Sequence, residues 1–565
     1  DFSYYGNVFK DYKFDGQFRL NKFLYDPTNP ELFKDLSKIV EATNYILNYQ
    51  VISARKYEVT LNTNGGLLSE TTLKGTSATE LVLPIPAYEG KEFDGWYTNR
   101  LFTSKKITTI HTGNKNDITL YAKWKNLVLD IILSDVIGEN MVVCQNKPIV
   151  FSGTGVNNKE VIVTFDNVLK KTTIKDGKWE VVFDAKSASF VPKKLVISCG
   201  TITYQFNNIL VGEVWLTAGQ SNMEFYLSWL SGVGYRYIGQ YGNFTNLDKI
   251  RIMKQYINDL GEFDSNDRLG NKWIAPTNVS DVYEQSAYSI AFACYLQGKL
   301  NVPIGIICSS RGGTYIEEWL SNDSLAKAGS SLSLNDASLK SRYYNGMTSK
   351  LSGLTISGVL WYQGENNCAN ANLYEKQFIE LVNQYRTLFN DNNLPIISTQ
   401  LVQYGYLDFK DIRLTQWKLT NLISNHYCVC GIDTGNEIDI HPIDKITIGK
   451  RAANIALEYV YKINKSSLSY YPISASLKDN KLTIKFEDGE KLMNIKEVKN
   501  IKLKLEDGRL IDATGKIVNN SIVIDTTYDV KEVYYLYAPY IGNIELYGDN
   551  NLPIAPFVLE VKKEI

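Results

Sequence analysis

The sequence predicts a multidomain protein in which a central α/β unit with a parallel sheet is flanked by all-β domains. Its 565 residues are too many for a single hydrophobic core. Between residues 209 and 462, apolar strand-like runs alternate with helix-like segments, which is typical of a parallel sheet covered by helices. At 126–208 and 463–565, short strand-like runs lie between turn signals, so we expect a β-sandwich and a second β-domain there.

The composition argues against several classes of function. The net charge is −1 and the Lys and Arg residues are spread along the chain, whereas nucleic-acid binding needs a basic stripe. No apolar run approaches the roughly 20 residues that span a bilayer, so no membrane span is expected. The hydrophobic fraction of 44% is sufficient for ordinary globular packing. We therefore expect folded domains without a nucleic-acid partner.

The cysteines and histidines predict neither a disulfide framework nor a metal site. The seven cysteines are an odd number with irregular spacing, and several lie in apolar stretches, so buried reduced thiols are expected. The three histidines form no HExxH motif, and no pair of CxxC motifs occurs. We therefore expect no metal ion and no cofactor.

Residues 57–125 have the features of a small surface module. Strand-like runs alternate with turns, and Asn64-Gly65 is a hairpin signal. With the runs FDGWY (93–97) and LYAKW (120–124), this segment resembles the internalin-type B-repeat, a β-grasp-like module of bacterial surface proteins. The resemblance implies a secreted or cell-surface protein, with attachment through missing or flanking regions as one possibility.

The start of the sequence gives less information. The chain begins at Asp1 with neither an initiator Met nor a signal peptide, which fits a processed or trimmed protein. Export is therefore argued from the B-repeat resemblance alone. Residues 1–56 are rich in Tyr, Phe and Lys, with a helix-like stretch near 31–50, and no role is assigned to them.

A serine lies at the end of the first predicted strand of the α/β unit. In VWLTAGQSNME (214–224) the apolar residues stop at Gly219, and a helix is expected to begin near Ser221. Ligand sites of open α/β sheets lie outside the carboxyl ends of the strands, and a helix start favours negative charge. Ser221 is thus a candidate nucleophile, although a serine before a helix also fits an N-cap.

Two later strands are followed by glycine-rich or polar loops. In IICSSRGGT (306–314), paired glycines let the backbone approach a ligand, so the Gly313 N–H is a candidate oxyanion donor; a plain tight turn is the alternative. In VLWYQGENN (359–367), the Gln363 amide is a second candidate donor, with a solvated polar loop as the alternative. Glu365 fits a supporting role in the same loop.

His441 is the candidate general base, because histidine titrates close to neutral pH. Of the three histidines, His111 lies in the B-repeat and His426 precedes an apolar strand without a neighbouring acid. His441 lies in the run DTGNEIDIHP (433–442), two residues after Asp439, and this carboxylate is expected to orient its ring.

The runs GQSNM, RGGTYIEEW, WYQGENN and DIHP together resemble the sialate O-acetylesterase family of the SGNH (GDSL-like) hydrolase superfamily. The likeness extends from about residue 128 to about residue 561. It implies an α/β/α sandwich and a serine esterase that removes O-acetyl groups from sialic acid. It also implies catalytic roles that are shared among five residues: Ser221 as nucleophile, His441 as base, Asp439 as orienting acid, and Gly313 and Gln363 as oxyanion donors beside the Ser221 N–H.

The chain departs from the family pattern at two informative positions. Most SGNH enzymes place the acid three residues before the histidine, where this chain has Ile438, so Asp433 stays a second candidate acid. Arg311 stands where the family often has an aromatic or small residue. Its guanidinium fits either pairing with a sialic carboxylate or capping of the loop.

Three other functions remain open at this point. The same chemistry fits an acetylxylan or general carbohydrate acetylesterase, since substrate choice resides in loops such as 225–245 and 325–345. For the sialate esterase and for the general acetylesterase alike, the expected partner is an O-acetylated sialoglycan or another acetylated sugar. The B-repeat and β-domains also fit a non-catalytic bacterial surface adhesin. A metal-dependent deacetylase conflicts with the small number of histidines.

Overall fold

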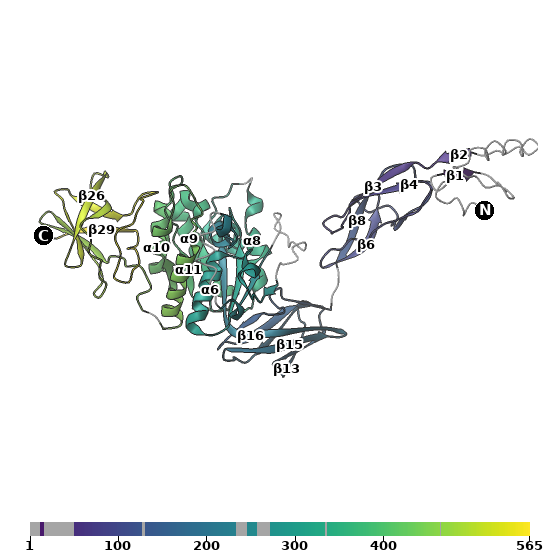
Figure 1. Ribbon diagram of the computed structural model, residues 1–565, viewed down its shortest axis with the longest axis horizontal. Coiled ribbons are helices and arrows are strands. Elements are labelled where there is room, and N and C mark those ends of the chain that lie inside the picture. The colour runs from purple at the N-terminus through teal and green to yellow at the C-terminus, as the bar shows by residue number, and fades with distance from the viewer. Residues whose placement is uncertain are drawn as a thin grey trace, which may run out of the picture. The chain divides into compact units, whose positions relative to one another are not determined.

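The computed structural model describes residues 12–15, 50–126, 130–232, 244, 246–256, 272–333, 336–463 and 465–564. The helix-like stretch predicted near 31–50 and most of the loop 225–245 lie outside these ranges. The chain divides into two compact units, Asp1–Val128 and Leu129–Ile565 (Figure 1).

The first unit is built from strands in its described part. Its main sheet has the order β4-β3-β8-β6, in which β3 and β8 are parallel and the outer pairs are antiparallel. Alternate residues of β3 are buried, and the Trp96 indole, 1% exposed, donates to the Pro84 carbonyl oxygen at 2.8 Å. The strands are β1 (Tyr12–Asp15), β2 (Gln50–Ser53), β3 (Lys56–Asn62), β4 (Thr72–Thr76), β5 (Leu81–Val82), β6 (Lys91–Tyr97), β7 (Thr109–Ile110) and β8 (Ile118–Asn126).

The second unit begins with two sheets packed face to face. One sheet contains β9 (Ile131–Leu133), β11 (Ile149–Gly155) and β14 (Lys178–Phe183); the other contains β12 (Glu160–Phe165), β13 (Val168–Thr173), β15 (Ser189–Cys199) and the first half of β16 (Ile202–Gly219). Phe151 and Phe183 of the first sheet meet Phe165 of the second edge to face, with ring centroids 5.3–5.8 Å apart. These contacts fill the space between the two sheets, as in a β-sandwich.

Strand β16 continues from this sandwich into the α/β unit without a break. Residues 202–206 pair with β15 in antiparallel fashion, and Glu213–Gly219 pair in parallel with β19 (Ile304–Ser310). Burial alternates over 202–208 and is continuous over 209–219, because the strand passes from a half-solvated sheet into one covered on both faces. The predicted domain boundary at 208/209 therefore falls inside one strand.

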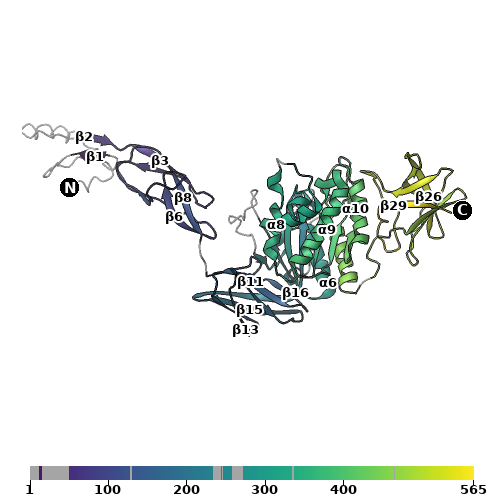
Figure 2. The same ribbon diagram turned by 180° about the vertical axis from the view of Figure 1, so that it is seen from behind.

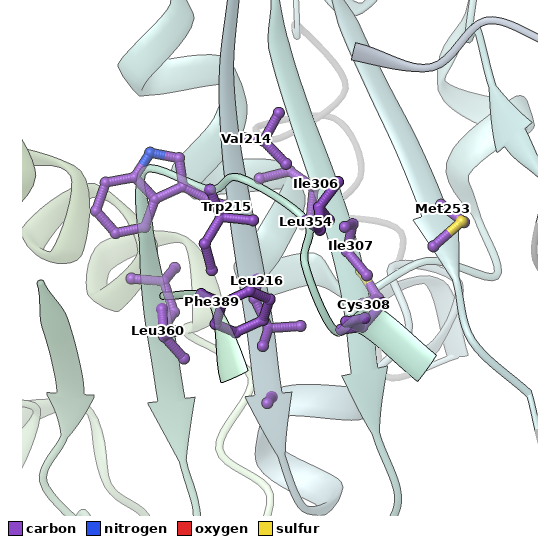
Figure 3. Close-up of a cluster of buried hydrophobic side chains, with 14 of the residues drawn as sticks. Val214, Trp215, Leu216, Met253, Ile306, Ile307, Cys308, Leu354, Leu360 and Phe389 are labelled. Carbon is purple, nitrogen blue, oxygen red and sulfur yellow. The ribbon is translucent and has the colours of Figure 1, made fainter. Parts of the chain in front are cut away.

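Within its described residues, the α/β unit has six strands that pair in parallel. Its strand order is β17-β19-β16-β20-β21-β22, and each neighbouring pair is parallel. The strands are short and almost wholly buried: β17 (Ile250–Lys254), β20 (Gly358–Tyr362), β21 (Ile396–Thr399) and β22 (His426–Val429), with antiparallel β18 (Trp273–Ile274) at the edge and β10 (Val142–Cys144) beside β16. Figure 3 shows the apolar side chains that β16, β17, β19 and β20 contribute to this core.

Helices cover both faces of the sheet. Trp215 of β16 packs against Phe292 of α6 (Ala287–Leu300) at 5.0 Å between ring centroids. Trp361 of β20 aligns with Ala218, on the face opposite to Trp215, and packs against Tyr385 of α9 (Ala371–Leu388) at 6.4 Å. Helix α11 (Lys445–Ile455) lies against α6 (Figure 1), and α10 (Lys410–Leu422) lies against α9 (Figures 1 and 2). Helix α7 (Asn322–Ala328) also packs against α9.

Short helical turns connect these elements. They comprise α3 (Ser221–Glu224), α4 (Trp229–Gly232), η2 (Leu247–Lys249), η3 (Val279–Val282), η4 (Ile316–Glu318), η5 (Ala337–Leu339), α8 (Arg342–Gly346), η6 (Thr348–Leu351), η7 (Glu365–Asn370), η8 (Ile432–Thr434) and η9 (Ala456–Val460). Among the described residues no helix is long and apolar enough to cross a membrane. The seven cysteines are unpaired, and all but Cys368 are buried.

The C-terminal region forms a closed β-barrel with the order β23-β24-β27-β26-β25-β28-β29. It is joined to α10, because Trp417 stacks on Tyr471 with centroids 5.8 Å apart and the buried Arg413 donates to the Ala538 and Pro539 carbonyl oxygens. The strands are β23 (Ser474–Lys478), β24 (Lys481–Lys485), β25 (Val498–Leu505), β26 (Leu510–Val518), β27 (Ser521–Asp525), β28 (Val530–Tyr535) and β29 (Phe557–Lys563).

Truncation of Phe292 tests the core beneath β16. Phe292→Ala is expected to lower the free energy of unfolding by about 3–5 kcal/mol, because it opens a cavity against Trp215. The matched control is Phe190→Ala, which truncates a side chain 41% exposed on β15. Urea unfolding followed by tryptophan fluorescence measures both variants. Equal loss of stability in the two would contradict the packing described here.

Candidate active site

Ser221 lies directly after the carboxyl end of β16. Gly219 adopts φ +141°, and a Cβ there would lie 2.1 Å from the Tyr362 carbonyl oxygen, so the turn requires glycine. The Gln220 N–H donates to that same oxygen at 3.0 Å. Helix α3 then begins at Ser221, which is partly exposed. Sheet geometry thus presents this hydroxyl at the edge where parallel sheets place their ligands.

The loop after β19 lies against Ser221. A Cβ built on Gly312 would be 3.3 Å from the Ser221 Cβ, and the Gly312 N–H donates to Glu224 Oε2 at 2.7 Å. The backbone N–H groups of Ser221 and Gly313 donate to no other group within the described ranges. Two unused donors therefore lie in the two segments that meet at the candidate nucleophile.

The predicted role of Gln363 as an oxyanion donor does not fit the structure. Its side chain is fully buried, and its Nε2 donates to the Thr314 carbonyl oxygen at 3.1 Å and to Asn367 Oδ1 at 2.8 Å. Both amide hydrogens are used in joining the loops after β19 and β20. The neighbouring Asn366 is less buried and donates to the Gly313 carbonyl oxygen at 2.7 Å, which leaves its second amide hydrogen available on the exposed side.

The loop that carries His441 is held against the start of α3. Asn222, next to Ser221, donates from Nδ2 to the carbonyl oxygen of Ile440, next to His441, at 3.0 Å and across 218 positions. The two predicted catalytic residues therefore come from segments in direct contact. No hydrogen bond joins the Ser221 hydroxyl to the His441 imidazole in the part of the chain that the structure describes.

Asp439 contacts the backbone of the histidine rather than its ring. Its Oδ1 accepts the His441 backbone N–H at 2.8 Å. Partial burial of the ring lowers the pKa of His441, the positive charge of Lys445 lowers it further, and the Asp439 charge opposes both. The imidazole is consequently biased toward its neutral form.

The second candidate acid, Asp433, is used elsewhere. Its carboxylate accepts two hydrogen bonds from Arg451, at 2.6 and 2.7 Å, and a third from Tyr547 of the C-terminal region at 3.2 Å. Asp433 therefore joins α11 to the C-terminal domain, and Asp439 is the predicted acid that lies beside His441. The other histidines match expectation: burial lowers the pKa of His426 to about 4, and His111 pairs with Glu80 in the first unit.

Comparisons with known proteins relate this chain to carbohydrate esterases. Residues 211–458 match the family described as carbohydrate esterase, sialic acid-specific acetylesterase, and residues 57–123 match the Listeria-Bacteroides repeat domain. The first of these matches covers nearly all of the α/β unit. Mouse sialate O-acetylesterase is 26% identical over 55% of this chain and 70% of its own length; the human protein is 30% identical over 44% and 52%.

A solved structure extends the likeness beyond the esterase domain. A carbohydrate acetylesterase from Xanthomonas citri has a TM-score of 0.67 and 26% identity, and the match covers 76% of this chain and 99% of that one. The β-sandwich, the esterase domain and the C-terminal domain are all contained in Leu129–Ile565, which is about the share of the chain that this match covers.

An aromatic group beside the esterase site was not predicted from the sequence. Phe225 follows α3, and Trp229, 42% exposed, packs against it at 5.3 Å and against Tyr226 at 4.7 Å between ring centroids. The Lys254 ammonium lies 4.1 Å from the Tyr226 ring centroid and bonds to its hydroxyl. Burial raises the pKa of the Tyr343 hydroxyl, and the positive charge of Arg311, from the loop after β19, lowers that pKa by a smaller amount.

Replacement of Asp433 tests whether this residue only links α11 to the C-terminal domain or also takes part in catalysis. Asp433→Asn is expected to lower stability by an amount on the order of 2–4 kcal/mol, since Arg451 loses a buried partner. Turnover of p-nitrophenyl acetate at temperatures well below unfolding should stay near wild type. The control is Asp507→Asn, which breaks an exposed ion pair with Arg509. Loss of turnover in a folded Asp433→Asn protein would identify Asp433 as the acid.

Proposed function

We propose that the protein is a serine esterase that removes O-acetyl groups from sialic acids and releases acetate. The observation that carries the proposal is the Asn222–Ile440 hydrogen bond, since it holds the Ser221 turn against the His441 loop. Unused backbone N–H groups on Ser221 and Gly313 add the electrostatic element that acyl transfer requires. The sialic acid-specific acetylesterase match over 211–458 supports the substrate class, and it also favours the SGNH-type α/β/α sandwich.

In the proposed reaction, the Ser221 oxygen attacks the acetyl carbonyl carbon while His441 takes the hydroxyl proton. The oxyanion that forms is stabilised by the Ser221 and Gly313 N–H groups and by the free amide hydrogen of Asn366. The C–O bond to the sugar then breaks, and His441 returns the proton to the sugar oxygen. Water attacks the acetyl-enzyme by the same route and releases acetate. No cofactor or metal ion takes part.

The neutral bias of His441 suits the role of base. A base accepts a proton only in its unprotonated form, and the lowered pKa of His441 favours that form. Asp439 contributes through its charge and through the backbone conformation that it fixes by accepting the His441 N–H. The proposed mechanism requires the His441 imidazole to reach the Ser221 hydroxyl, and the Asn222–Ile440 hydrogen bond between the neighbouring residues favours that approach.

The sugar specificity has one competing assignment. Similarity to a carbohydrate acetylesterase from Xanthomonas citri over 76% of the chain favours a general carbohydrate acetylesterase, of which an acetylxylan esterase is one form. Arg311, in the loop after β19 beside Ser221, is the proposed partner of a sialic carboxylate.

The first unit supports a proposal about location. The Listeria-Bacteroides repeat at 57–123 fits a secreted or bacterial cell-surface protein in which this module serves as a spacer or weak adhesin. A wholly non-catalytic adhesin is disfavoured, because the esterase domain retains a candidate nucleophile, base and acid in adjoining segments.

Replacement of the nucleophile tests the mechanism. Ser221→Ala is expected to reduce p-nitrophenyl acetate turnover by about 10⁴-fold or more with an unchanged far-UV spectrum, because no acyl-enzyme forms. A fluorophosphonate probe should add its mass to the Ser221 peptide of the wild type only. The matched control is Ser228→Ala, which alters a nearby serine whose hydroxyl faces Glu284. Full activity in Ser221→Ala would exclude the serine mechanism.

Acetate release from two polymers tests the substrate class. O-acetylated sialoglycan is expected to give the larger kcat/KM, and acetylated xylan the smaller. Arg311→Lys should lower the ratio of the sialoglycan kcat/KM to the xylan kcat/KM. The reason is that loss of a bidentate carboxylate contact raises KM for the sialoglycan alone. A preference for xylan would reject the sialate assignment and leave the esterase chemistry in place.

A further inference from the structure

A buried lysine lies beneath the esterase site. Lys445 is the first residue of α11, four positions after His441, and its side chain is fully buried. Lysine is almost never found in that state unless it is paired. Its ammonium donates to the Asn222 Oδ1 at 2.8 Å and to the Pro442 carbonyl oxygen, and it lies 4.7 Å from the Phe225 ring centroid.

Asn222 connects this lysine to three segments. Its Oδ1 accepts from Lys445, and its Nδ2 donates to Glu365 Oε1 at 2.6 Å and to the Ile440 carbonyl oxygen at 3.0 Å. Asn222 is 1% exposed and Glu365 is 3% exposed. Every hydrogen-bonding group of the asparagine amide is thus fixed inside the protein. The network joins the turn after β16, the loop after β20 and the loop that carries His441.

This network holds the backbone on both sides of His441. The carbonyl of Ile440, just before His441, accepts from Asn222, and the carbonyl of Pro442, just after it, accepts from Lys445. A backbone held on both sides of one residue leaves that residue little freedom to shift. Because Asn222 follows Ser221 directly, the same contacts fix the distance between the two proposed catalytic segments.

We propose that Lys445 is a positioning residue of the esterase, which holds the nucleophile turn and the histidine loop in register and sets the charge beside the imidazole. This inference rests on the proposed roles of Ser221 and His441. Lys445 touches neither the substrate nor the reacting atoms. A misplacement of about 1 Å at a reacting pair costs about 10²-fold in rate, so a contact of this kind controls turnover from a distance.

The charged groups around Lys445 come from two sides. Glu365 faces it from the loop after β20, and Asp439 and Asp444 face it from the histidine loop, where His441 is the titrating neighbour. Burial lowers the pKa of Lys445 to about 7, although the three carboxylates oppose that shift. Burial also raises the pKa of Glu365, whose Oε2 has no partner among the described residues.

The position of Lys445 has a consequence for the pH profile. Its positive charge contributes to the lowered pKa of His441. Removal of that charge therefore raises the pKa of His441. Activity is lost in acid as the imidazole takes up a proton, so the acidic limb of kcat/KM then moves to higher pH. A lysine that served stability alone would leave this limb in place.

The test compares variants of the full chain with p-nitrophenyl acetate as substrate. Lys445→Met is expected to lower kcat by about 10²-fold with little change in KM, and to move the acidic limb of kcat/KM to higher pH. The matched control is Lys450→Met, which removes an exposed lysine from the same helix and should change neither quantity. If both variants share the wild-type kcat and pH profile, the proposal is wrong.

A second variant guards against misfolding. Lys445→Met leaves the Glu365 carboxylate without a buried opposite charge, whereas Lys445→Met with Glu365→Gln removes both charges and keeps an acceptor for Asn222. The same loss of kcat and the same shift of the acidic limb are expected in the double variant, and wild-type values there would overturn the proposal. Activity in Ser221→Ala or His441→Ala would instead reject the proposed function, so the two failures are distinguishable.

Discussion

The turn that ends β16 is the constraint on which the site depends. β16 is the strand shared by the sandwich and the α/β sheet, and its neighbours β19 and β20 end beside it. Gly219 lets the backbone pass within reach of the Tyr362 carbonyl, a position that no side chain would permit. The hydroxyl of Ser221 thereby emerges between the loops after β19 and β20.

The polar residues near this turn have two different roles: some are buried and bind other parts of the protein, and others are left available at the site. Buried amides must use their hydrogen bonds internally, since an unpaired one is costly. Gln363 and Asn222 face inward and join the loops, whereas Ser221 and Gly313 keep N–H groups unused. The same run of polar residues therefore provides both the frame of the site and its reactive surface.

Much of this arrangement could be predicted from the sequence, but not the partners of individual side chains. Continuous apolar runs separated by helical segments indicated the parallel sheet, and polar loops after successive strands had to meet at one edge. Gln363 and Asp433 could not be assigned in this way. Their partners, Thr314 and Tyr547, lie far away in the chain, and the burial that decides the role of each side chain is a property of the packed structure. The continuity of β16 was missed because a change in burial pattern resembles a domain boundary.

The electrostatics of the site follow from how the histidine loop is held. Asp439 accepts the backbone N–H of His441 and so fixes the loop conformation, while its charge raises the pKa of the ring. Lys445 fixes the other side of the same loop through the Pro442 carbonyl and lowers that pKa. Asp439 and Lys445 thus each restrain the loop backbone and also shift the pKa of the His441 ring. A loop restrained by one anion and one cation keeps its imidazole in place, and partial burial, the largest of the three influences, lowers the pKa of the ring and favours the neutral form that accepts a proton.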